Sequence, residues 1–259
     1  MKIIRMNRFR TVALLLAAAL ICTGPARAET KVGATVESRL LVGFKVDDAA
    51  AQAWMPEGWK AITLPKGPLA GANVMLVLMD RHLILDPEGK PQTPSSGRAA
   101  ALLSYGVAEG QPGPRLFITR VFEPAPIVDP YGNSVPAQIT RSAQSSVGAD
   151  GATTRSEAWV VTPEAGGKIT VDLSFASGTG TLVKGAEALP YSAARPEFHR
   201  IYRYDQMVEL VMSAAMDKPV AGDVAVTVDL PDMAAMFDGS QQLAAILSIP
   251  VYIRDVFLP

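Results

Sequence analysis

Arg120 is the residue whose position most suggests chemistry. It falls in a predicted strand, Arg115 to Glu123, where alternation would place it on the same face as Leu116, Ile118 and Phe122. A guanidinium on an apolar face needs a counter-charge or a bound anion, because an unpaired buried charge is costly. We therefore expect Arg120 either to clamp a ligand carboxylate at a cavity mouth, or to reach water or pair with a core acid.

The two histidines offer weaker signals. His82 and His199 are the only imidazoles, so a Ser-His-Asp site would have to use one of them. Asp80, His82 and Asp86 share a face of a predicted strand and could present ligands to a metal. The simpler interpretation, which we adopt, is that this strand ends in solvent and that His199 is a hydrogen-bonded surface residue. We predict no metal and no cofactor.

Several function classes are excluded by what the sequence lacks. It contains no G-x-S-x-G, S-x-x-K or H-E-x-x-H motif and no G-x-x-x-x-G-K-[ST] phosphate loop. The net charge of −1 over 259 residues provides no basic excess for nucleic acid. The single cysteine, Cys22, excludes a disulfide scaffold.

The first 28 residues are typical of a secretory signal peptide. Four basic residues precede an apolar run from Thr11 to Cys22, and Ala26-Arg27-Ala28 supplies the small residues of a cleavage site after Ala28. Ile21 is bulkier than a lipoprotein site prefers before Cys22. Cleavage leaves 19 basic and 25 acidic residues, no cysteine and no later apolar run that could span a bilayer. We expect one acidic domain, 29–259, in the periplasm or secreted.

Alternating hydrophobicity predicts a mostly β protein. Two short helices are expected, over Ala49 to Trp54 behind an Asp47-Asp48 cap and over Asp232 to Leu247 behind Pro231. About ten strands separated by turns predict a curved antiparallel sheet, closed or nearly closed into a barrel with an interior cavity. The predicted strands are Val36 to Val46, Ala72 to Leu85, Ala99 to Ala108, Arg115 to Glu123, Ala137 to Ser145, Ser156 to Thr162, Lys168 to Phe175, Phe198 to Met212 and Val224 to Leu230.

The first predicted strand has one apolar and one polar face. The even positions from Val36 to Val46 are mostly apolar, whereas the odd positions include Glu37, Arg39 and Lys45. The default interpretation is that the odd face is wet and that Arg39 forms a solvated cross-strand pair.

The order of these elements resembles the acetoacetate decarboxylase-like superfamily. A strand ending in Val46-Asp47-Asp48 leads to a helix and then to Trp54-Met55-Pro56-Glu57-Gly58-Trp59, similar to the family's leucine-proline-glutamate-glycine-leucine turn. Ala101 to Tyr105, the strand Leu116 to Thr119, and Pro130-Tyr131-Gly132 follow in the family's order. The resemblance covers most of residues 36–230 and implies a β-barrel-like core with a cavity for small carboxylates or ketones.

The resemblance also implies what this chain lacks. The decarboxylase forms a Schiff base through a lysine after a Gly-x-Pro-like turn, and an adjacent lysine and an apolar pocket lower the pKa of that amine. The corresponding stretch here, Gly132 to Ala137, has no lysine, and none occurs between Lys90 and Lys168. The family's acid after an aromatic residue is missing too, because Gly106 and Val107 follow Tyr105. Schiff-base decarboxylation therefore has little support.

If the family topology holds, Tyr105, Tyr131 and Arg141 line the same cavity as Arg120, and a family arginine lies near Arg39. Each of these residues could equally be structural. The leading hypothesis is an exported small-molecule-binding or accessory protein for a small apolar or carboxylated ligand, without covalent chemistry. The alternatives are a divergent enzyme acting on a keto acid or another carbonyl compound by acid-base catalysis, and an envelope protein that binds a partner. A homo-oligomer is compatible with all three.

Overall fold

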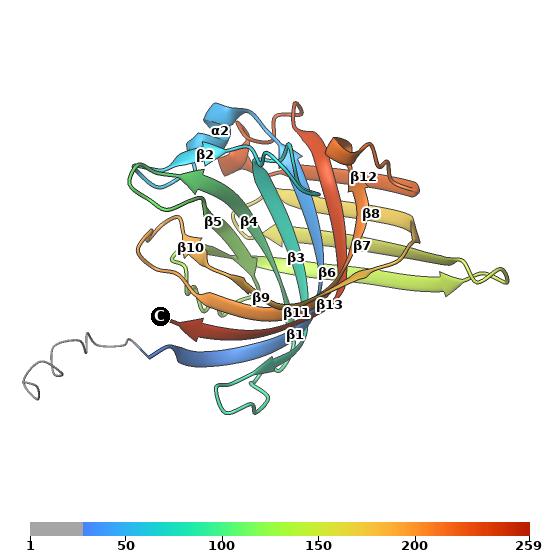
Figure 1. The fold of residues 1–259 in the computed structure, drawn as a ribbon, viewed down its shortest axis with the longest axis horizontal. Helices are drawn as coiled ribbons and strands as arrows, with labels where there is room; N and C mark the ends of the chain where they lie inside the picture. Colours follow the sequence, from blue (N-terminus) through green and yellow to red (C-terminus); the bar gives the residue numbers. More distant parts are fainter. Residues whose placement is uncertain (1–27) are drawn as a thin grey trace, which may run out of the picture.

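The computed structural model describes residues 28–259 (Figure 1). The predicted signal peptide therefore lies almost wholly outside the described residues. Strands make up 59% of the described residues and helices 5%, so this part of the protein is mostly β. The strands are β1 (Thr30–Lys45), β2 (Lys60–Ile62), β3 (Val74–Leu85), β4 (Gly97–Val107), β5 (Arg115–Glu123), β6 (Ser134–Val147), β7 (Thr153–Pro163), β8 (Lys168–Ser177), β9 (Thr181–Ala188), β10 (Pro190–Ser192), β11 (Ile201–Ser213), β12 (Gly222–Asp229) and β13 (Gln242–Leu258).

The thirteen strands form one curved, mixed sheet that is not closed. Its order is β12-β8-β7-β6-β5-β4-β3-β1-β13-β11-β9, with β10 beside β5 and β2 beside β4. The pairs are antiparallel except β5 with β6 and β5 with β10. Strand β6 changes partner along its length, from β5 at Ser134–Pro136 to β7 from Ala137 onward. This change lets the meander β6-β7-β8-β12 fold behind β1, β3 and β4 (Figure 1).

The main core fills the space between these two layers. It combines fully buried residues of β1, β3 and β4, such as Leu40, Leu76 and Leu102, with residues of the meander, such as Trp159 and Val171. Along each strand these residues are two positions apart, as expected for one face of a sheet.

The opposite face of β1, β3 and β4 is also buried, so the predicted wet face is wrong. Glu37 is only 1% exposed. A second cluster, which includes Met75, Val77, Leu103 and Ile118, lies on that face. Strands β5, β11 and β13 curl over this second face and shield its apolar side chains from water. The same curl encloses the cavity described below.

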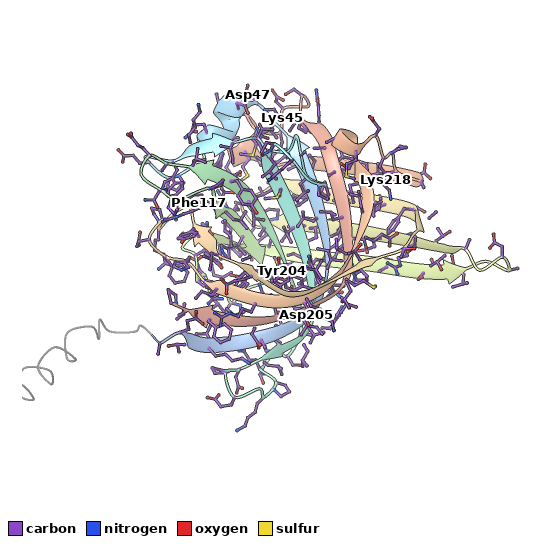
Figure 2. The ribbon with its side chains drawn as sticks, viewed as in Figure 1. Lys45, Asp47, Phe117, Tyr204, Asp205 and Lys218 are labelled. Carbon is purple, nitrogen blue, oxygen red and sulfur yellow. The ribbon has the colours of Figure 1, made fainter. Side chains whose placement is uncertain are left out.

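The first predicted helix is present and the second is not. Helix α2 (Asp48–Gln52) begins where the Asp47 side chain accepts a hydrogen bond from the Ala50 amide at 2.9 Å (Figure 2). The segment 232–247 instead forms a 3-10 turn, η2 (Pro231–Met233), and the start of β13. A short apolar run that is buried on both faces has no period that separates helix from strand. A second 3-10 turn is η1 (Ala214–Met216).

Nine predicted strands are present with shifted ends. The sequence missed β2, β9 and β10, of which β2 and β10 have three residues each, and it missed β13. Among residues 28–259, no helix has the length and apolar character that a membrane crossing needs.

Candidate functional site

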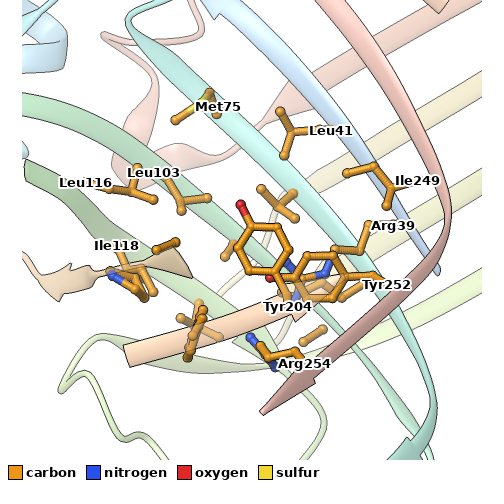
Figure 3. Close-up of a pocket in the computed structure, with 18 of the residues that line it drawn as sticks. Arg39, Leu41, Met75, Leu103, Leu116, Ile118, Tyr204, Ile249, Tyr252 and Arg254 are labelled. Atoms are coloured by element: carbon orange, nitrogen blue, oxygen red, sulfur yellow. The ribbon is translucent and has the colours of Figure 1, made fainter. Parts of the chain in front are cut away.

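A cavity of about 360 Å³ lies on the second face of the sheet, under the curl of β5, β11 and β13 (Figure 3). Neighbouring residues of β11 show the two sides of this wall, since Tyr204 lines the cavity while Asp205 is exposed (Figure 2). The volume is within the range of small-molecule sites.

The cavity has an apolar end and an arginine end. Along β3 the lining residues run from Met75 through Val77 and Met79 to Arg81. The lining residues of β1 and β13 change from apolar to charged in the same direction, from Leu41 to Arg39 in β1 and from Leu247 to Arg254 in β13. The strand register brings the polar residues together, because Glu37 is paired with both Arg81 and Tyr252.

Glu37 is the centre of the arginine end. Its carboxylate accepts from Arg39 Nε at 2.7 Å, from Arg254 Nη2 at 2.9 Å and from Thr35 Oγ1 at 2.6 Å. Burial opposes the charge of Glu37, but the charges of Arg254 and Arg39 and these hydrogen bonds outweigh burial. They lower the pKa of Glu37 from 4.5 to about 2, so it is a carboxylate at neutral pH.

The guanidinium groups of Arg39 and Arg254 each lie over the ring of a tyrosine. The Arg39 guanidinium carbon lies 3.5 Å from the centre of the Tyr252 ring, and that of Arg254 lies 4.2 Å from the centre of Tyr202. Tyr204 stacks on Tyr252, with ring centres 4.8 Å apart (Figure 3). These contacts leave the guanidinium groups little freedom to turn away from the cavity.

Three of the arginines that line the cavity have a buried donor without a partner. They are Arg39 through Nη2, Arg81 through Nε and Arg200 through Nε. Burial lowers the pKa of Arg81, and Glu37 and Glu123 offset this only in part. Buried guanidinium donors are normally satisfied, so these groups have unused capacity to donate hydrogen bonds to an anion.

Protonated phenols complete the arginine end. The hydroxyls of Tyr131 and Tyr202 are hydrogen-bonded at 2.6 Å. Burial, together with the neighbouring Tyr202, raises the pKa of Tyr131 well above its usual range. Burial raises the pKa of Tyr252 to about 12, and it also raises the pKa of Tyr105, which lines the apolar end of the cavity opposite Leu116. These phenols therefore remain neutral hydrogen-bond donors at physiological pH.

Three of the five predicted ligand-binding residues line this cavity. Arg39, Tyr105 and Tyr131 do so, and Arg39 is mostly buried against Glu37 rather than in a solvated pair. Arg120 and Arg141 lie elsewhere.

Arg120 faces the other side of β5 because of a β-bulge. The register with β4 shifts at Thr119, so that Leu102 pairs with Arg120 and Leu103 with Ile118. Leu116, Ile118 and Val121 consequently line the cavity, and Arg120 does not share their face. Its Nη2 lies 2.7 Å from an Asp232 carboxylate oxygen, with the Trp54 ring beside it. The predicted common face of Leu116, Ile118 and Arg120 is thus wrong.

Arg141 belongs to a separate ion-pair network at the edge of the main core. It contacts Asp80 at 2.9 Å and Glu157 at 3.0 Å. His82 is hydrogen-bonded to Ser38, which also accepts from Arg141. Over residues 28–259, no three His, Cys, Asp or Glu side chains are grouped in a way that could hold a metal ion.

His199 stacks on Tyr191, with ring centres 4.5 Å apart. Burial, with the charge of Arg115, lowers the pKa of His199.

Sequence reasoning missed Glu37, Arg81, Arg200 and Arg254 as site residues. The alternation of Tyr252 with Arg254 after Pro250 was a usable signal, as was that of Tyr202 with Tyr204. Glu37 resembled an ordinary solvent-facing residue because only the curl of β11 and β13 buries it.

No family model and no curated protein sequence matches the chain. Solved structures do. The enduracididine biosynthesis enzyme MppR complexed with pyruvate aligns with a TM-score of 0.55 and 12% identity, covering 90% of this chain and 91% of that one. An acetoacetate decarboxylase-like enzyme from Sphingomonas wittichii RW1 aligns with a TM-score of 0.54 and 12% identity, covering 88% and 92%. The chain therefore has an acetoacetate decarboxylase-like fold, as its sequence suggested.

The buried charge of Glu37 predicts an acid-sensitive structure. The pKa of Glu37 is lowered on folding, so its contribution is complete above about pH 4.5 and is lost as the pH falls towards 2. This loss corresponds to about 3 kcal/mol. Urea unfolding of the wild type and of Glu37→Gln between pH 2 and 6 should show the difference between them shrink in acid. Glu88→Gln, at an exposed turn, is the matched control. Parallel profiles for wild type and Glu37→Gln would contradict this assignment.

Proposed function

We propose that this protein binds a small organic anion with an apolar body, without forming a covalent bond to it. The observation that carries the proposal is the buried, unpartnered Nη2 of Arg39, where the polar and apolar parts of the cavity meet. An apolar ligand alone would leave that donor unsatisfied, and a purely polar ligand would leave the aliphatic wall wet.

The charges around the cavity favour an anion. Four arginines line it, and Glu123 and Glu37 are the acids beside them, which leaves two positive charges in excess among the described residues. Glu37 and Tyr252 fix Arg39 before any ligand arrives. A guanidinium held in this way can donate to a carboxylate at little entropic cost.

Non-covalent binding is supported by the lining residues. No lysine is among those that line the cavity within residues 28–259. A Schiff base needs a neutral primary amine beside the carbonyl, so this cavity supplies none.

The test of anion binding compares Arg81→Gln, Arg39→Gln and Arg120→Gln, titrated with hexanoate by calorimetry. Losing one charged hydrogen bond should weaken binding by about 10- to 100-fold in the first two variants. Arg120→Gln should match wild type, because its partner is Asp232. Arg81 has no carboxylate partner, so Arg81→Gln should bind less without a lower melting temperature. Equal affinities in all four proteins, or no binding by wild type, would refute the proposal.

Export is the second part of the proposal, and the sequence of residues 1–28 supports it. The intact mass of the protein recovered from its own host should correspond to a chain beginning at Glu29. Ala28→Asp should block cleavage and leave the full-length chain. A wild-type protein that retains Met1, or that carries lipid on Cys22, would contradict the predicted cleavage.

A second candidate function is acid-base catalysis on a carbonyl compound, and the Tyr131–Tyr202 pair favours it. As a base such as the Glu123 carboxylate, which also lines the cavity, takes the proton from the α-carbon, a neutral phenol beside Arg254 could donate a proton to the developing enolate oxygen. Under the binding proposal, pyruvate incubated with the protein in D₂O should show no methyl deuteration above the background by proton NMR. Deuteration by wild type that is lost in Tyr131→Phe would instead favour the enzyme.

A further inference from the structure

The cavity is longer than a short acid requires. In the strand register Arg39 is opposite Met79, and the lining of β3 continues four residues beyond, to Met75. Four residues of extended strand span about 13 Å. An acid of two to four carbons with its carboxylate on Arg39 would leave most of this length empty.

The walls of this stretch are mostly aliphatic, with the Tyr105 side chain at the level of Leu116. They come from five strands and include Leu41, Met75, Leu103 and Leu116 (Figure 3), together with Leu247 of β13. Within the described range, no residue of β1, β3, β4, β5 or β13 that lines this stretch is charged, whereas Arg39, Arg81 and Arg254 lie towards the other end. A ligand therefore meets charge at one end only, which disfavours a dicarboxylate, because its second charge would be buried without a partner.

We propose that the ligand is an unbranched aliphatic monocarboxylate of about eight to ten carbons, since each carbon–carbon bond of an extended chain adds about 1.25 Å. This inference rests on the proposed function. The carboxylate accepts from the free donors of Arg39 and Arg81, and the chain runs along β3 towards Met75. The stacked Tyr204 and Tyr252 flank the carboxyl end, and the leucines enclose the methyl end.

The test is a calorimetric series of butyrate, hexanoate, octanoate and decanoate, with succinate and 3-phenylpropionate as competitors. Each methylene buried in this stretch should lower the Kd about fourfold, so octanoate, with four more methylenes, should bind about 250-fold more tightly than butyrate.

Variants that block the middle of the cavity provide the comparison with the wild-type chain-length series. Ala101 is opposite Val77, between the carboxyl and methyl ends, and lines the cavity. Ala101→Phe should abolish the gain from hexanoate to decanoate. Val77→Met is a milder second variant, in case the larger ring prevents folding. Ala143→Phe, on the exposed part of β6, should keep the wild-type series.

The outcomes separate the two proposals. Affinities independent of chain length, or tighter binding of succinate or 3-phenylpropionate than of octanoate, would overturn the medium-chain inference while leaving anion binding intact. Failure of every acid to bind would overturn both. A wild-type gain per methylene that Ala101→Phe or Val77→Met removes would establish the inference.

Discussion

The arrangement of this molecule depends on one buried carboxylate. Glu37 lies in the middle of the sheet, out of reach of water, and a charge in that position persists only with close partners. Those partners come from β1 and from β13, at opposite ends of the sequence. The network therefore fixes how β13 and β11 lie over β1. It also leaves two arginines rigidly placed at the end of a cavity, with hydrogen-bonding capacity that Glu37 does not use.

The cavity exists because the central strands are apolar on both faces. One face of β1, β3 and β4 packs on the meander β6-β7-β8-β12 and forms the main core. The other face has no second layer to fill it completely, so the curl of the same sheet encloses a space instead. Residues of opposite parity on one strand thus face different surroundings, with Leu76 and Leu78 in the core and Met75 and Val77 on the cavity wall. The pleat of the strands separates the core from the cavity.

The sequence was a good guide to local structure and a poorer one to what lies across space. Alternation located most strands, and the Asp47 cap located α2, because both signals are local. The β-bulge at Thr119 places Arg120 on the face opposite to that of Leu116 and Ile118, and no sequence pattern in β5 predicts this bulge. The burial of Glu37 depends on β11 and β13, which begin more than 160 residues further along the sequence, and no local period can reveal it. Similarly, Arg141 and Arg120 are arginines of the same appearance as Arg39, and only the fold separates ion-pair partners from cavity residues.

The central claim is that the arginine end of the cavity receives a carboxylate, and a crystal structure of residues 29–259 grown with octanoate tests it most directly. We expect one octanoate in the cavity, with a carboxylate oxygen within hydrogen-bond distance of Arg39 Nη2 and the alkyl chain running towards Met75. Octanoate bound in the reverse direction, or beside Arg120 with the cavity holding only water, would contradict it.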